Sequence, residues 1–244
     1  MKLNYETCIV GTKCILVPYR QIHVDRYHEW MQSPALLEAT GSEPLSLEEE
    51  YEMQESWRVD DKKCTFIVLQ RSKLSKEPPL ELGERDDDFV SANLEAMVGD
   101  VNLFLSNEED DDDDEEEQDD SEQQPVEDSH HSLRIQAELD IMIAEESARG
   151  QGIGQEASCL MMLYGVQRLG IQRFFCKINE DNESSLKLFR KLKFHECDYA
   201  ACFKQYEYEL KRRSPGEVAE TLRPFLNSTD LFTFTTKSDA IETN

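Results

Sequence analysis

The sequence predicts a mixed α/β (α+β) protein, built on one sheet with helices packed on both of its faces. Two observations support this fold class. Strand and helix patterns follow one another in the order β-α-α-β-β-β-α-β-α-β, which is typical of a mixed sheet covered by helices. Of the 244 residues, 39% are apolar, which is enough for the core of one domain of ordinary size.

Five elements are predicted in the first part of the chain. Ser46 is predicted to be the N-cap of one helix, because Ser46 and Glu49 are the pair of residues that forms a capping box. Residues 71–93 contain two consecutive prolines and are predicted to be a loop. The five elements are strands at 14–19, 64–69 and 97–105, and helices at 22–31 and 47–57.

An acidic insertion follows at residues 106–132. From Ser106 to Asp128 there are 15 Asp or Glu residues and no Lys or Arg, so the segment repels itself and has nothing to bury. We predict that it is disordered and occupies the loop of a hairpin, because strand patterns flank it on both sides. The cost of closing a loop grows slowly with its length, so the fold tolerates the insertion.

Five more elements are predicted after the insertion. Asn182 is placed to cap one helix, and Gly170 to end another as its C′ residue. The elements are strands at 137–144, 173–178 and 203–210, and helices at 155–169 and 183–192. Residues 1–210 are therefore predicted to form a single domain. The patterns fade beyond it, and residues 211–244 are predicted to be a flexible C-terminal tail.

Composition excludes several classes of function. The chain has 52 acidic and 26 basic residues, which argues against nucleic acid and anionic membranes as partners because both attract Lys and Arg. The seven cysteines are odd in number and lack C-x-x-C spacing, so neither a disulfide framework nor a metal site is predicted. The N-terminus has no signal-peptide pattern. We expect a soluble protein of the reducing cytoplasm, with the nucleus left open.

A glycine-rich segment carries the strongest functional signal. Residues 149–154, Arg-Gly-Gln-Gly-Ile-Gly, follow a predicted strand and open a predicted helix. Glycines let the backbone turn tightly, and the first N–H groups of a helix have no internal partners. With the helix dipole behind them, these groups favour an anion such as a pyrophosphate. The spacing fits neither G-x-x-x-x-G-K-[ST] nor G-x-G-x-x-G, so a P-loop and a dinucleotide fold are disfavoured.

Two patterns together indicate a family. Arg149, Gly152 and Gly154 match R/Q-x-x-G-x-G, and Asn182, Ser185, Leu188, Phe189 and residues 191–194 match a second pattern downstream. These residues resemble the cofactor segments of the GNAT family of N-acetyltransferases. Residues 138–143 are similar to a strand of its ribosomal-protein-acetylating branch. Stretches at 17–19, 28–31, 42–45 and 97–105 are similar to its tubulin-acetylating group, and the resemblance covers residues 1–210.

The resemblance implies a mostly antiparallel sheet in which two parallel strands splay apart, with acetyl-CoA lying in the gap as co-substrate. It implies direct attack on the thioester by an amine of a protein or peptide, the N-terminus of tubulin being one such acceptor. A non-catalytic acetyl-CoA-binding scaffold is the alternative. The implied cofactor contacts are the strand backbone at Ile141, Met142 and Ile143, the loop residues Arg149, Gly150, Gln151, Gly152, Ile153 and Gly154, and Asn182, Ser185 and Phe189.

A basic cluster in the second half of the chain is expected to support cofactor binding. Six basic residues lie between Arg173 and Lys193, with three acids among them. Such an island in an acidic chain suits the phosphorylated adenosine end of CoA. For Lys187 and Arg190, a solvated helix face is an equally good interpretation.

Carboxylates on one strand are the candidate catalytic groups. Glu138 and Asp140 share a face by the two-residue period of a strand, and Asp100 lies on the neighbouring strand. A base must take the proton of the attacking amine, and we predict Glu138 as the leading candidate. Phe189 stands where the family often has a Tyr that protonates the leaving thiolate. A phenyl ring cannot donate a proton, so another group serves or none does.

Overall fold

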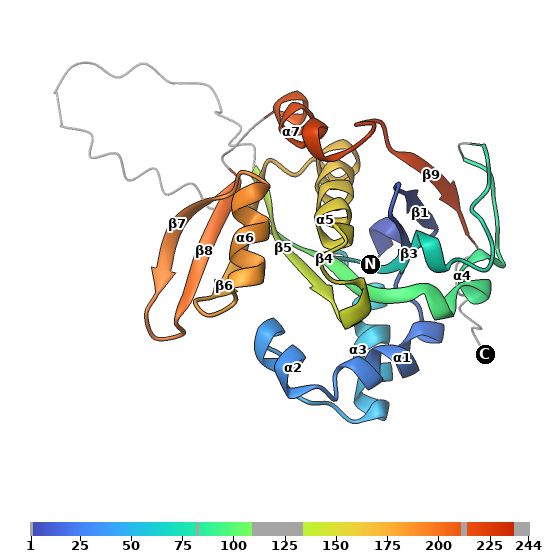
Figure 1. The fold of residues 1–244 in the computed structure, drawn as a ribbon, viewed down its shortest axis with the longest axis horizontal. Coiled ribbons are helices and arrows are strands. Elements are labelled where there is room, and N and C mark those ends of the chain that lie inside the picture. Colours follow the sequence, from blue (N-terminus) through green and yellow to red (C-terminus); the bar gives the residue numbers. More distant parts are fainter. Residues whose placement is uncertain (1, 82, 109–133, 211–213, 237–244) are drawn as a thin grey trace, which may run out of the picture.

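One nine-stranded sheet organises the computed structural model, which describes residues 2–81, 83–108, 134–210 and 214–236 (Figure 1). Its strands are β1 Thr7–Val10, β2 Cys14–Pro18, β3 Lys63–Gln70, β4 Met97–Glu108, β5 Arg134–Ile143, β6 Arg173–Asn179, β7 His195–Ala200, β8 Gln205–Leu210 and β9 Phe232–Thr235. Their order is β7-β8-β6-β5-β4-β3-β2-β1-β9. Within these ranges every neighbouring pair is antiparallel except β5 and β6, which confirms the predicted fold class.

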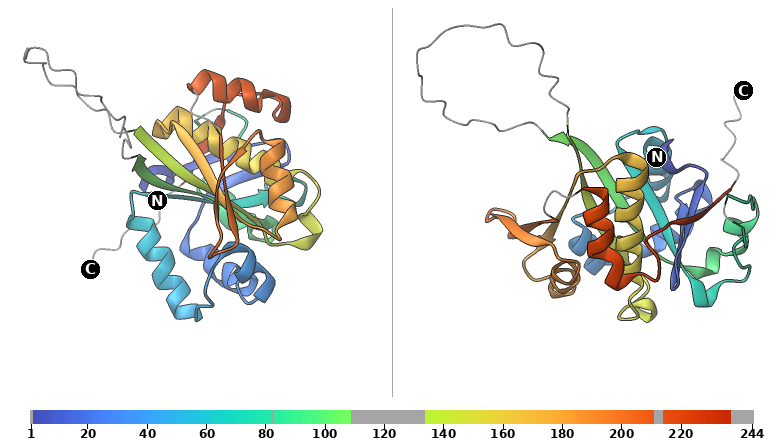
Figure 2. Two further views of the ribbon diagram at one scale, coloured as in Figure 1. Left: turned by 90° about the vertical axis from the view of Figure 1, so that its left-hand side faces the viewer. Right: turned by 90° about the horizontal axis from the view of Figure 1, so that it is seen from above.

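Helices cover both faces of the sheet. They are α1 Val24–Trp30, α2 Pro34–Thr40, α3 Leu47–Val59, α4 Phe89–Ala92, α5 Ile153–Tyr164, α6 Glu183–Lys191 and α7 Pro215–Leu222. Figure 2 shows α5, α6 and α7 on one side of the sheet, here called the α5 face, and α1, α2 and α3 on the other, here called the α1 face. In the described part of the chain, no helix has the length and apolarity to cross a membrane.

Each face of the sheet has its own apolar core, because strand side chains alternate between the two faces. On β5, Leu139 and Ile141 belong to the core of the α5 face, whereas Met142 belongs to that of the α1 face. The α5-face core joins the sheet to α5 and α6, and the α1-face core joins it to α1. The polar side chains Glu138 and Asp140 therefore lie on the α1 face, with Met142.

Local signals in the sequence placed the helix ends correctly. The Ser46 hydroxyl accepts a bond from the Glu49 N–H (3.3 Å), and the Glu49 carboxylate accepts one from the Ser46 N–H (2.8 Å). Asn182 caps α6 through a bond from the Ser185 N–H to its Oδ1 (3.1 Å). Gly170 has φ 69° and ends the single π-helical turn that continues α5. Each of these predictions is confirmed.

Several elements were not predicted. The strands β1 and β7 and the helices α2 and α4 are absent from the pattern analysis. All but one of the residues of β7 are exposed and α2 has no buried residue, so neither shows the apolar periodicity on which such predictions depend. The strand β4 continues through residues 106–108, which were assigned to the acidic insertion. Residues 109–133, with the rest of that prediction, lie outside the described residues.

The prediction of a flexible C-terminal tail is wrong for residues 214–236. Ser214 caps α7 by accepting a bond from the Glu217 N–H (3.4 Å), and Val218 and Leu222 are buried in the core of the α5 face. The strand β9 pairs antiparallel with β1 and becomes one edge of the sheet. Short elements such as these gain stability from tertiary packing, which a local pattern does not reveal. The folded unit thus extends to residue 236.

The strand β9 should be essential to stability. Phe234 is fully buried and its ring packs edge-on against Phe89, 5.0 Å between centroids. Replacing a buried Phe by Ala typically costs about 3–5 kcal/mol, so we expect Phe234→Ala to lower the free energy of unfolding by that amount in a urea titration. The control is Phe203→Ala, because Phe203 is 75% exposed. Equal effects of the two substitutions would show that β9 does not belong to the cooperative unit.

Candidate active site

A gap opens in the middle of the sheet between β5 and β6. The two strands pair at Gln136 with Arg173, Ala137 with Phe174 and Glu138 with Phe175. Beyond these positions β5 runs on to Ile143 and β6 to Asn179 with no further pairing between them. This is the splayed parallel pair that the resemblance implied, and the structure confirms it.

Backbone groups of β5 face this gap at alternate residues. The Ile135 carbonyl accepts a bond from the Gln172 N–H (2.8 Å), which marks the odd-numbered residues as those turned toward β6. By the same alternation, Ile141 and Ile143 present their backbone groups to the gap. Met142 does not, because its carbonyl oxygen is turned toward β4, where it leaves no room for a Cβ on Gly99. The prediction that the Met142 backbone pairs with pantetheine is therefore wrong.

The glycine-rich loop lies at the end of β5, and its backbone has the geometry that an anion cradle requires. Gly150 and Gly152 have φ of 73° and 80°, a left-handed conformation that glycine adopts without strain. Gly152 is the N-cap residue of α5, and the first intrahelical bond runs from the Glu156 N–H to the Gly152 carbonyl (3.1 Å). The N–H groups of Ile153, Gly154 and Gln155 precede that bond, so they are available to an anion.

Side chains of the loop hold it in place. The Arg149 guanidinium donates to the carbonyl oxygens of Ile143 (2.8 Å) and Ala144 (3.1 Å), which fixes the loop to the end of β5. The Gln151 amide donates to the Ser147 carbonyl (2.5 Å) and accepts a bond from the Gln70 amide (3.2 Å). Arg149 and Gln151 therefore organise the backbone cradle, which leaves the loop N–H groups as the contacts for an anion.

The residues from α6 contribute less to the site than the loop does. Because the Asn182 Oδ1 caps the helix, only the amide hydrogens of that side chain are left for a ligand. Ser185 is partly buried one turn into α6. Phe189 is 3% exposed and packs on Phe194, 5.0 Å between ring centroids, so it lies in the apolar core. No phenol stands at this position to donate a proton.

Three carboxylates gather on the α1 face beside the gap. Asp140 lies opposite Asn102 in the β4–β5 ladder, and Asp100 is the diagonal neighbour of Asp140 on the same face. The Asn102 amide donates to the Asp100 Oδ2 (2.7 Å). Glu138 forms an ion pair with Lys177 on β6 (3.2 Å), just where the gap begins. The structure thus brings together all three candidate bases, and adds Asn102 and Lys177 to them.

Burial raises the pKa values of two of these carboxyls, those of Asp140 and Asp100. Burial raises the pKa of Asp140 to about 7, with smaller contributions from the charges of Glu138 and Asp100, and Lys177 opposes the shift. Burial likewise raises the pKa of Asp100 to about 6, against the bond from Asn102. A carboxyl with a pKa near 7 is suited to exchange protons at neutral pH. Asp140 therefore has the properties of a general base.

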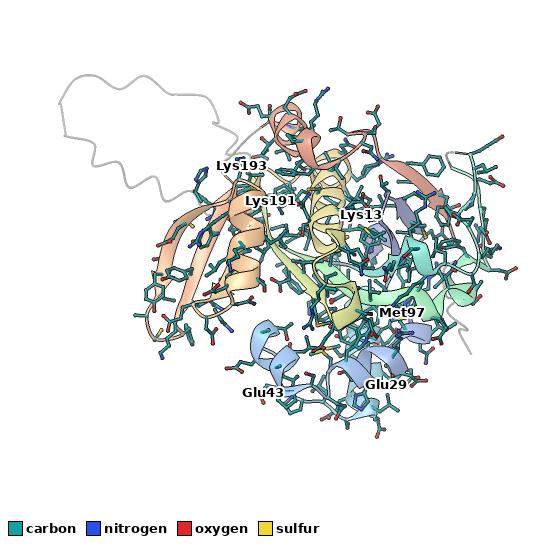
Figure 3. All side chains as sticks on the ribbon, in the orientation of Figure 1. Lys13, Glu29, Glu43, Met97, Lys191 and Lys193 are labelled. Carbon is teal, nitrogen blue, oxygen red and sulfur yellow. The ribbon has the colours of Figure 1, made fainter. Side chains whose placement is uncertain are left out.

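The expected basic cluster does not form. Lys177 pairs with Glu138 and Arg173 with Glu207 and Glu209, all on the α1 face. On α6, Lys187 pairs with Glu183, and Arg190 bonds the Tyr208 hydroxyl. Figure 3 shows Lys191 and Lys193 at the C-terminal end of α6. The glycine-rich loop lies elsewhere, between the C-terminal end of β5 and the N-terminal end of α5. The number of basic residues in this part of the sequence therefore did not predict a positively charged surface beside the gap.

The geometry fits acetyl-CoA. The left-handed glycines and the free N–H groups at the start of α5 suit its diphosphate, and the β5 backbone in the gap suits the amides of its pantetheine arm. Asn102, Gln70 and Lys13 were missed from the sequence; Asn102 follows from strand register, and the other two have no local signal. Lys177 was counted in the expected basic cluster, and its place beside Glu138 follows from strand register. Among the described residues, no group of three or more His, Cys, Asp or Glu is arranged to hold a metal ion.

Comparisons with known proteins show the family of this chain. A family described as the acetyltransferase (GNAT) domain matches residues 13–195. An N-acetyltransferase 9-like protein of Nematostella vectensis is 44% identical, covering 84% of this chain and 86% of its own. Alpha/beta-tubulin-N-acetyltransferase 9 of Mus musculus is 42% identical over 88% and 75% of the two chains. The chain belongs to the GNAT acetyltransferase family.

Solved structures share the fold. The crystal structure of spermidine N-acetyltransferase from Vibrio cholerae, in complex with CoA and spermine, is 14% identical and superposes with a TM-score of 0.55 over 82% of this chain and 94% of that one. Family membership makes this protein an acetyl-CoA-dependent N-acetyltransferase, an enzyme rather than the non-catalytic scaffold that was the alternative.

The glycine-rich loop should be required for cofactor binding. Gly152→Asp places a side chain and a negative charge in the cradle, so we expect it to abolish the rise in melting temperature that acetyl-CoA gives the wild type. The control is Gly170→Asp, which imposes the same left-handed strain (φ 69°) beyond the opposite end of α5. This control should lower the melting temperature but keep the ligand-induced rise. A full rise in Gly152→Asp would exclude the loop from the site.

Proposed function

We propose that this enzyme acetylates the N-terminal amine of a protein chain, with tubulin as the acceptor, and that Asp140 takes the proton of that amine. The observation that carries the proposal is the carboxylate group Glu138, Asp140 and Asp100 on the α1 face, directly beside the gap. A free amine is largely an ammonium ion at neutral pH, so a site lined by carboxylates attracts it. The name of the mouse relative, alpha/beta-tubulin-N-acetyltransferase 9, supports the choice of acceptor.

The chemistry asks three things of the chain. Acetyl-CoA, when bound, supplies an acyl carbon activated as a thioester. The attacking amine must be neutral, and Asp140 is about half ionised near pH 7 and thus able to remove its proton. Negative charge develops on the carbonyl oxygen, and the β5 N–H groups turned into the gap are donors placed to stabilise it. The thiolate leaves without a phenol at Phe189, which its low basicity permits.

Two observations support Asp140 over Glu138 as the base. Glu138 is engaged in an ion pair with Lys177 at 3.2 Å. Asp140 has no ion-pair partner in the described part of the chain, and Asp100 lies beside it. Glu138 then serves to orient Lys177 at the head of the gap, where the two strands part.

The place of action is part of the proposal. All seven cysteines are free thiols, and five of them are buried. Free thiols in such number suit a reducing compartment, and we assign the protein to the cytoplasm on that ground. The acceptor proposed here is an intracellular protein in the same compartment.

Asp140 should control the pH dependence of catalysis. In the wild type, kcat should rise with pH through about 7 as the Asp140 carboxyl loses its proton. This rise is the acidic limb of the pH profile. In Asp140→Asn the acidic limb should disappear, and kcat near pH 7 should fall by a factor on the order of 10². The deficit should shrink at higher pH, because more of the amine is then already neutral.

Glu138→Gln is the matched variant, two residues away on the same face of β5. It should keep the acidic limb, with a change mainly in KM for a cationic acceptor. Loss of the limb in Glu138→Gln, together with its survival in Asp140→Asn, would assign the base to Glu138 instead.

A peptide assay tests the proposed function directly. Peptides with the N-terminal sequences of α- and β-tubulin are incubated with acetyl-CoA, and the products are located by mass spectrometry. We expect acetyl groups on the free N-terminal amine, none on N-terminally blocked peptides that keep a lysine, and at least a tenfold slower reaction with Asp140→Asn. Acetylation confined to lysine would overturn the N-terminal assignment, and no product from an enzyme that binds acetyl-CoA would exclude tubulin.

A further inference from the structure

The turn between β1 and β2 is fastened to the start of α5. The carboxylate of Glu156 accepts bonds from three successive backbone N–H groups, those of Thr12 (3.1 Å), Lys13 (2.6 Å) and Cys14 (2.9 Å). Glu156 lies in the first turn of α5 and is 5% exposed. A buried carboxylate is tolerated only when hydrogen bonds satisfy it, so this arrangement fixes the turn firmly to the helix.

This contact places the Lys13 side chain on the glycine-rich loop. The Lys13 ammonium donates to the Gln151 carbonyl (2.8 Å), one residue before the N-cap of α5. The Lys13 Nζ is also only 2.5 Å from the position that a Cβ on Gly152 would take. Gly152 thus has a left-handed backbone that favours glycine, and a side chain at this position would displace the flexible end of Lys13.

A hollow of about 380 Å³ adjoins this contact, and its lining includes Thr12, Lys13, Gln70, Arg71, Ser72 and Gln151. Gln70 is 6% exposed, and its Oε1 has no hydrogen-bond partner among the described residues. Arg71 donates to the Gly11 carbonyl (2.8 Å) and lies 3.9 Å from Glu77. The hollow therefore combines two cations with polar groups next to the free N–H groups of α5.

Lys13 differs from the cations of β6 and α6. Arg173 and Lys177 are neutralised by carboxylates on the α1 face, and Lys187 by Glu183 on α6. Within the described ranges no ion pair involves Lys13, whose ammonium is held by a backbone carbonyl alone. An ammonium presented in this way next to a helix N-terminus keeps its charge available for a second negative group.

We propose that Lys13 is the cation of the phosphate-binding site of acetyl-CoA, presented by the β1–β2 turn and positioned by Glu156. The ligand chemistry is a phosphate oxygen that carries negative charge, from either the 5′-diphosphate or the 3′-phosphate of CoA. The inference rests on the acetyl-CoA dependence in the proposed function and deepens it. It gives the N-terminal hairpin, remote in sequence from the loop, a direct part in cofactor binding.

Calorimetric affinities of CoA test this role. Lys13→Met should weaken CoA binding about tenfold relative to wild type, because a charge-assisted bond is lost, and Lys13→Arg should restore it to within about threefold. Lys191→Met, at the far end of α6, is the matched control and should leave the affinity unchanged. The affinity of the wild type should also fall more steeply with added salt than that of Lys13→Met.

Truncated ligands separate a contact with phosphate from a structural role. Acetyl-pantetheine has no phosphate, so its kcat/KM should be the same for wild type and Lys13→Met. With 3′-dephospho-CoA, an undiminished effect of Lys13→Met assigns the contact to the diphosphate, and a vanishing effect assigns it to the 3′-phosphate.

Two results would overturn the proposal: equal CoA affinity of wild type and Lys13→Met, or an equal loss with acetyl-pantetheine, which would make Lys13 only a support for the loop. A wild type that fails to bind CoA at all is a separate result, and it would refute the proposed function itself.

Discussion

The parting of β5 from β6 is the constraint on which the rest of the site depends. A strand in the middle of a sheet normally has both edges bonded, and unpaired backbone groups are costly when they are buried. Here each strand keeps a continuous partner on its outer side, β4 for β5 and β8 for β6, so the gap opens without loosening either strand. The apolar cores on both faces hold those pairs in register. The inner backbone edge of β5 is thus left as a binding surface in an otherwise closed sheet.

The start of α5 depends on contacts from distant parts of the chain. Its first turn continues from β5 through the loop, which Arg149 ties to the Ile143 and Ala144 carbonyls. Its other side is fixed by Glu156 to the β1–β2 turn, more than 140 residues away in sequence. Both attachments bond a side chain to backbone groups, which restricts the conformations open to the loop. Such preorganisation reduces the ordering cost of binding.

Features that depend on a few neighbouring residues were predictable from the sequence. The caps at Ser46 and Asn182, the C′ glycine and the glycine cradle are examples, since each is defined within a few positions. Features set by register were not, because pairing depends on distant residues: Asn102 opposite Asp140, Lys177 beside Glu138, and β9 on β1. The basic cluster failed for a simpler reason. The two-residue period of β6 puts Arg173 and Lys177 on the face opposite α6, so their charges never combine with those of the helix.

The enzyme must hold a polyanionic cofactor and a cationic amine a short distance apart, and the sheet separates the two electrostatic environments. The N–H groups of α5 and the Lys13 ammonium lie beyond the end of β5, whereas Glu138, Asp140 and Asp100 lie on the α1 face. Strand alternation makes this possible with few residues, because Ile141 turns its side chain into the α5-face core while the residues on either side of it turn theirs to the α1 face. Because burial raises the pKa of Asp140 to about 7, its carboxyl is only partly ionised at neutral pH. It therefore repels the phosphates of the cofactor less than a fully ionised carboxylate would. One strand can therefore offer backbone to the thioester arm and a proton acceptor to the amine.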